Sequence, residues 1–78
     1  MVVKRYIPKN GDYVSGKEMQ GMSVVDMKGW VNNVREQDGY MRVFIQCDDR
    51  YGGYRCGVLI EEYGDINYID RRDRPDIT

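Results

Sequence analysis

Histidine is absent from this chain of 78 residues, and the sequence has only two cysteines, two prolines, one tryptophan and one phenylalanine. Without histidine, a single chain can form neither a Ser-His or Cys-His catalytic pair nor a histidine-containing metal site. Two adjacent glycines, Gly52 and Gly53, lie between predicted strands, without the following helix that a phosphate-binding loop needs. We therefore expect a protein that is not an enzyme and that uses no metal or cofactor.

The chain also lacks an excess of charge of either sign and any long apolar run. Twelve basic and 13 acidic residues give a formal net charge of −1, which provides no basic field for duplex DNA. The apolar runs are too short for a membrane span or a secretory signal segment. These features predict a cytoplasmic protein that has no contact with a membrane.

The chain is long enough for one small domain. An apolar content of 41% and a charged content of 32% are typical of a folded globular chain. We expect a single domain over residues 1–70. Residues 71–78 are mostly charged and include Pro75, so we expect them to form a flexible tail.

A meander of three strands between Met27 and Glu62 is the clearest structural signal. Its first turn is Asp38-Gly39, a pair that favours the type I′ turn of a two-residue hairpin. This turn places Val34 opposite Val43. Continued without interruption, the same register places Trp30 opposite Cys47, whereas a bulge at 32–33 would bring Val31 to the same face as Val34.

Alternation along the second strand of the meander separates two faces. Four side chains are predicted to point into the core, namely Met41, Val43, Ile45 and Cys47. The intervening Tyr40, Arg42, Phe44 and Gln46 are predicted to point outward, beside Arg35 or Val31 of the preceding strand. The third strand is expected to point Cys56, Val58 and Ile60 inward. The two cysteines would then be small core thiols, and a disulfide between them is the alternative.

The rest of the chain completes an all-β domain. Asp12 begins a first strand, residues 15–22 are interpreted as a long loop, and residues 61–65 as a short 3₁₀ turn before a last strand that contains Ile66 and Ile69. Five short strands, a long first loop and a short 3₁₀ turn before the last strand predict a small SH3-like barrel.

Part of this pattern resembles a known family. The residues concerned are Gly11-Asp12-x-Val14, Lys28-Gly29-x-Val31-x-x-Val34, the Asp38-Gly39 hairpin, and Val58-Leu-Ile followed by Tyr63-Gly-Asp-Ile-x-Tyr-Ile-Asp70. Over roughly residues 10–70 the chain is similar to the variable subunit of ferredoxin:thioredoxin reductase and to the small barrel subunits on the stromal side of photosystem I. The resemblance implies a non-catalytic SH3-like barrel that docks on a partner protein, and it transfers no catalytic residue.

The outward face of the meander is the candidate site. Tyrosine and arginine are enriched at the energetic centres of protein interfaces, and both occur along this segment. We expect a non-catalytic accessory or inhibitory protein, monomeric or weakly dimeric, that binds a partner protein through Tyr40, Arg42, Phe44, Tyr51, Tyr54 and Arg55. Two alternatives remain open. One is a KOW-like barrel that stacks single-stranded RNA on the same aromatic residues, and the other is a phage or mobile-element inhibitor of a host enzyme.

Overall fold

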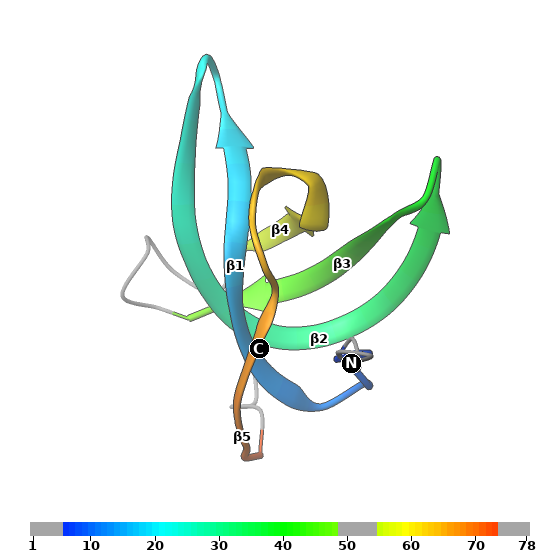
Figure 1. The fold of residues 1–78 in the computed structure, drawn as a ribbon. Helices are drawn as coiled ribbons and strands as arrows, with labels where there is room; N and C mark the ends of the chain where they lie inside the picture. The colour runs from blue at the N-terminus through cyan, green and yellow to red at the C-terminus, as the bar shows by residue number, and fades with distance from the viewer. Residues whose placement is uncertain (1–5, 49–54, 74–78) are drawn as a thin grey trace.

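Five antiparallel strands form a single sheet in the order β4-β3-β2-β1-β5 (Figure 1). The structure is a computed structural model that describes residues 6–48 and 55–73. The elements are β1 at Asp12–Gln20, β2 at Ser23–Gln37, β3 at Tyr40–Cys47, β4 at Cys56–Ile60, the 3₁₀ turn η2 at Glu61–Tyr63, and β5 at Asn67–Arg71. The prediction of an all-β fold with five strands and a 3₁₀ turn before the last strand is confirmed.

Strand β2 is long and strongly curved, and it organises the sheet (Figure 1). Its first half pairs with β1 and its second half with β3. Gly29 lies where the two halves meet, and a Cβ atom there would lie 2.3 Å from the carbonyl oxygen of Gln46. No side chain fits at this distance, so glycine allows β2 and β3 to approach each other closely at the bend.

The β2–β3 turn has the geometry that its sequence predicts. Asp38 has φ of 55° and Gly39 has φ of 83°, as a type I′ turn requires. Val34 pairs with Val43, as predicted. The register then shifts between Val31 and Asn33. The interpretation with a bulge is therefore the correct one, and the uninterrupted pairing of Trp30 with Cys47 is wrong.

The prediction of a long first loop is wrong, because most of residues 15–22 belong to β1. That strand continues to Gln20 and pairs with β2 up to the Gln20–Ser23 pair, so only Gly21 and Met22 form the turn. Gly21 has φ of 61° at the first central position, as in a type II′ turn. This hairpin extends to the top of the molecule in Figure 1, and Met22 at its turn is fully exposed.

The hydrophobic core lies on the inner side of the curved sheet. Met41, Val43, Ile45 and Cys47 are 0–2% exposed, which confirms the predicted inward face of β3. The other buried members come from β1, β2, β4 and the segment before β5: Val14, Met27, Val31, Leu59 and Ile66.

The side chains of β4 that point into the core are not the ones predicted. Leu59 pairs with Val43 and is fully buried, whereas the neighbouring side chains of Val58 and Ile60 are half-buried on the outer side. Cys56 is exposed and Cys47 is buried, and both are free thiols. The prediction of two core thiols is therefore wrong for Cys56. Burial, together with the nearby charge of Glu18, raises the pKa of the Cys47 thiol.

The two ends of the sheet order are β4 and β5, and their edges differ. On β4, the backbone N–H of Val58 donates to the Glu18 carboxylate of β1 at 3.4 Å. Among the described residues, no strand pairs with the outer edge of β5. Closure of the sheet into an SH3-like barrel stays a prediction.

Strand β5 ends at Arg71, the first residue of the predicted tail. Its guanidinium donates to the Asp12 carboxylate, and that of Arg72 donates to Asp70. Strand β5 thus includes one residue beyond residue 70, and the flexible tail stays a prediction. Residues 74–78 lie outside the described residues.

Candidate binding surface

The candidate surface is the side of β2, β3 and β4 that faces away from the core, which we call the outer face. Because residues directly opposite in an antiparallel pair share a face, the register assigns its members. They are Trp30, Asn33, Arg35 and Gln37 of β2, Tyr40, Arg42, Phe44 and Gln46 of β3, and Cys56, Val58 and Ile60 of β4. All are exposed or half-exposed except Trp30, which is 5% exposed.

The centre of the outer face is apolar. Phe44 lies opposite Val58 on one side and opposite Asn33 on the other. Ile60 is two residues along β4 from Val58 and lies opposite Arg42. The half-buried apolar side chains of β3 and β4, two adjacent strands, form a continuous patch that a partner could cover.

Two arginines lie side by side on this patch. Arg35 of β2 is directly opposite Arg42 of β3. The Arg35 guanidinium carbon is 5.6 Å from the centre of the Phe44 ring, within the range of a cation–π contact. Nη1 of Arg42 donates to the backbone carbonyl of Gln37 at 3.1 Å. No residue of the outer face is acidic, so neither guanidinium has a carboxylate partner on that face.

Three of the six predicted site residues, Tyr40, Arg42 and Phe44, lie together on the outer face. Arg55 does not join them: its carbonyl accepts the N–H of Cys47 at 2.8 Å, and its side chain contacts the thiol of this inward-facing residue. The other two, Tyr51 and Tyr54, lie outside the described residues.

Val58 and Ile60 are members of the surface that the sequence interpretation assigned to the core. Gly57 is the feature of the sequence that could have indicated this orientation. It lies on the inner side of β4, where its lack of a side chain leaves room for Cys47 and Glu18. A Cβ atom on Gly57 would come within 3.1 Å of both the Cys47 sulfur and the Glu18 carboxylate. Alternation from an inward Gly57 makes Leu59 inward and Val58 outward.

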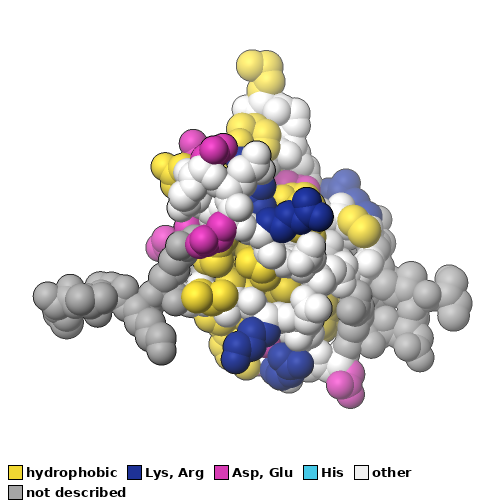
Figure 2. Space-filling view, turned by 90° about the vertical axis from the view of Figure 1, so that its right-hand side faces the viewer, with side chains coloured by type: hydrophobic (Ala, Val, Ile, Leu, Met, Phe, Trp, Pro, Cys, Tyr) yellow, Lys and Arg dark blue, Asp and Glu magenta, His cyan; other side chains and the backbone are white. Residues whose placement is uncertain are grey.

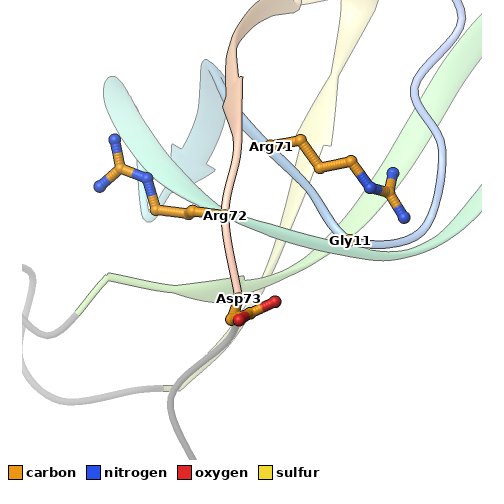
Figure 3. A pocket seen from close by; sticks show the side chains of 4 residues that line it. All are labelled: Gly11, Arg71, Arg72 and Asp73. Atoms are coloured by element: carbon orange, nitrogen blue, oxygen red, sulfur yellow. The ribbon is translucent and has the colours of Figure 1, made fainter.

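A second group of arginines lies at the end of β5, beside a hollow of about 550 Å³ that is lined by Gly11, Arg71, Arg72 and Asp73. Figure 3 shows that the guanidiniums of Arg71 and Arg72 point to opposite sides of the strand. Arg72 forms two hydrogen bonds to Asp70, at 2.7 and 2.5 Å, and lies 4.2 Å from the centre of the Tyr13 ring. The hydrogen bond from Arg72 holds the pKa of Asp70 below its usual range.

Arg71 belongs to a cluster around Asp12, a carboxylate that is 6% exposed. We call this group the Asp12 cluster. Asp12 accepts hydrogen bonds from the Tyr6 hydroxyl at 2.6 Å, the Lys9 amide at 3.1 Å and the Arg71 guanidinium at 2.9 Å. Burial alone would raise the pKa of Asp12, but these three donors lower it below its ordinary value. Burial and the bond to Asp12 raise the pKa of Tyr6.

Hydrophobic side chains also reach the surface elsewhere. Figure 2 shows several of them in the middle of one side of the molecule, with Lys and Arg side chains above and below. The most exposed include Met22 at 101%, Ile7 at 64% and Tyr68 at 50%. Unlike the outer face, these three come from separate segments: the β1–β2 turn, the segment before β1, and β5.

Among residues 6–48 and 55–73, no three His, Cys, Asp or Glu side chains are grouped in a way that could hold a metal ion. The same residues include no helix with the length and apolar character needed to span a bilayer. No protein-family model, curated protein or solved structure matches the chain. The resemblance to barrel subunits of electron-transfer enzymes therefore stays a prediction.

Proposed function

We propose that this chain is a non-catalytic binding module that docks on a partner protein through the outer face of β2, β3 and β4. The observation that supports the proposal is the continuous patch around Phe44 and Val58, which is half-buried in the isolated chain and bordered by Tyr40, Arg35 and Arg42. Aromatic and arginine side chains around an apolar centre are typical of protein interfaces.

The partner relationship is accessory or inhibitory. Such a role needs a rigid display surface and no reactive group, and β3 provides the first because its inward side chains are tightly buried. The two free thiols are consistent with a reducing compartment, so we place the protein in the cytoplasm.

Stacking of single-stranded nucleic acid is the less favoured function for this face. A base stacks on an open aromatic ring, but Phe44 is half-buried and Arg35 lies over its ring. Tyr40 is 40% exposed at the edge of the face, beside the turn. The arrangement around Phe44 suits lateral contact by apolar side chains better than insertion of bases.

Photo-crosslinking from two matched tyrosine positions tests the proposal. A photoreactive phenylalanine analogue replaces Tyr40 on the outer face or, as control, Tyr68 on β5, which is similarly exposed at 50%. In cells that produce the protein, we expect a discrete protein adduct from position 40 and none of that mass from position 68. The adduct from position 40 should disappear when the same chain also carries Phe44→Lys. Cooperative unfolding of this variant would show that it is still folded.

Two crosslinking results would contradict docking on the outer face alone. Adducts of equal yield from both positions would mean that contact is not confined to the outer face. An adduct from position 68 alone would move the docking surface to β5 and overturn the proposal.

A further inference from the structure

The outer face carries two positive charges and no negative charge, although the whole chain has a formal net charge of −1. The acidic residues near it in sequence do not occupy its paired positions: Asp48, which follows β3, is buried and accepts a hydrogen bond from the Tyr13 hydroxyl, and Glu61 and Glu62 lie in η2. Glu36 lies opposite the inward Met41 and so belongs to the other side of the ladder, and Asp38 lies in the turn. The paired positions of the outer face therefore carry only the positive charges of Arg35 and Arg42.

The arrangement of the two arginines is unfavourable in the isolated chain. Like charges directly opposite each other on neighbouring strands destabilise a sheet. Elsewhere on the chain, Lys17 pairs with Asp26 at 2.5 Å and Arg72 with Asp70 at 2.5 Å. The Arg35–Arg42 pair differs from these because Arg35 contacts an aromatic ring and Arg42 donates to a backbone carbonyl.

Carboxylates fit this pair better than any group of the chain that contacts it. A guanidinium binds a carboxylate through two parallel N–H···O bonds, and such charge-assisted bonds are stronger than a bond to a neutral carbonyl. A carboxylate placed between the two guanidiniums would also remove their mutual repulsion. The apolar Phe44, Val58 and Ile60 beside them provide an adjacent contact for apolar side chains.

Resting on the proposed function, we propose that the partner of the outer face is an acidic protein segment. Its carboxylates bind Arg35 and Arg42, and its apolar side chains cover Phe44 and Val58. The charge complementarity of a face with two cations and no anion specifies this partner, and the apolar centre distinguishes a peptide from a phosphate backbone, which has no apolar group to place there.

Nuclear magnetic resonance of the whole isotope-labelled chain tests this inference with defined probes. Three short synthetic peptides share one alternating pattern of valine and phenylalanine, with glutamate, lysine or glutamine at the intervening positions, and oligouridylate is the fourth probe. We expect the glutamate peptide to shift the amide signals of Arg35, Arg42 and Val58. The affinity should fall as salt is raised, because the contact is ionic.

Charge reversal on the outer face supplies the second readout. Arg42→Glu and Arg35→Glu should each weaken binding of the glutamate peptide by about tenfold or more. The matched control is Lys28→Glu, because Lys28 is on the same strand but lies opposite Ser15 of β1 rather than β3. It makes the same change in net charge and should alter the affinity less than about twofold.

Each other outcome has a definite meaning. If the lysine or glutamine peptide shifts the same signals as strongly, the face docks proteins but not through carboxylates, and only this inference fails. If oligouridylate shifts them and the glutamate peptide does not, the face binds nucleic acid and both proposals fail. Equal weakening by Lys28→Glu would also overturn the acidic partner. A lack of outer-face shifts with every probe would count against docking on this face altogether.

Discussion

The two arginine pairs of this protein are used in opposite ways. Arg71 and Arg72, at the end of β5, each donate to a carboxylate of the same chain. Arg35 and Arg42 lie directly opposite each other on a face without carboxylates. The charges of the first pair are balanced by carboxylates of the same chain, whereas the charges of Arg35 and Arg42 are not balanced on their face. A residue type alone therefore does not mark a binding site, because the partners that the fold supplies decide which arginines remain for a ligand.

The largest expected effect on stability comes from removing Asp12, the carboxylate to which Arg71 of the first pair donates. Asp12→Ala leaves the Tyr6 hydroxyl and the Arg71 guanidinium without their acceptor, and should lower the free energy of unfolding by about 3 kcal/mol. Urea denaturation measures this change. The control is Asp26→Ala, which removes a carboxylate that is 76% exposed and paired with Lys17. It should cost less than about 1 kcal/mol, and an equal loss would contradict the structural role of Asp12.

The same carboxylate predicts how stability depends on pH. The pKa of Asp12 is lowered in the folded chain, so its contribution is present above the unfolded value of about 4 and is lost as the pH falls through the folded value. The pKa of Tyr6 is raised, so its contribution is present below about pH 10 and is lost as the pH rises further.

Thermal unfolding across this pH range checks both directions. Asp12→Asn should flatten the acid side of the stability profile, and Tyr6→Phe should flatten the alkaline side. Arg35→Gln should leave the shape of both sides unchanged, because it introduces no titratable group and Arg35 is not among the hydrogen-bond partners of Asp12. A profile in which Asp12→Asn retains the full acid dependence would contradict the assignment.

A smaller effect on the free energy of unfolding distinguishes the two arginine pairs directly. Arg71→Met removes one of the three donors to Asp12 and should lower the free energy of unfolding by about 1 kcal/mol, because the Arg71 side chain is largely solvated. Arg35→Met removes a repelling charge and keeps an apolar stem against Phe44, so it should change stability by less than about 0.5 kcal/mol. Denaturant midpoints compared at equal slope measure both. Equal losses would mean that the two arginines have the same structural role.

The smallest expected effect is an increase in the free energy of unfolding. Arg42→Glu places a carboxylate opposite Arg35 and should raise the free energy of unfolding by a few tenths of a kcal/mol, because an attraction replaces a repulsion. Arg42→Gln removes only the repulsion and should give a smaller gain. Added salt should reduce both gains. A clear loss of stability in Arg42→Glu at low salt would show that the two guanidiniums do not repel each other.

Part of this fold is determined by local chemistry and could be predicted from the sequence. Asp38-Gly39 requires one turn type, and that turn sets the register that pairs Val34 with Val43. The outward direction of Arg42 and Phe44 follows from the same register. The neighbouring Gly21 turn was missed because the inner positions of the end of β1 are Glu18 and Gln20, which break the apolar alternation that identifies a strand.

The composition of the candidate surface depended on long-range pairing that the sequence does not fix. The β3–β4 ladder pairs Val43 with Leu59. A shift of one residue in such a ladder moves every side chain to the other face. The sequence interpretation placed Val58 and Ile60 inward for this reason, and so the apolar centre beside Phe44 was not recognised.

The bond between Glu18 and the Val58 amide has a consequence for solubility. An exposed edge strand is a template on which another chain can add a strand, and repeated addition leads to aggregation. On β4, a charged carboxylate accepts the backbone donor that such an addition would use. A second chain would have to displace and bury this charge, which is costly. We therefore expect Glu18, which points inward from β1, to disfavour the addition of a strand at this edge of the domain.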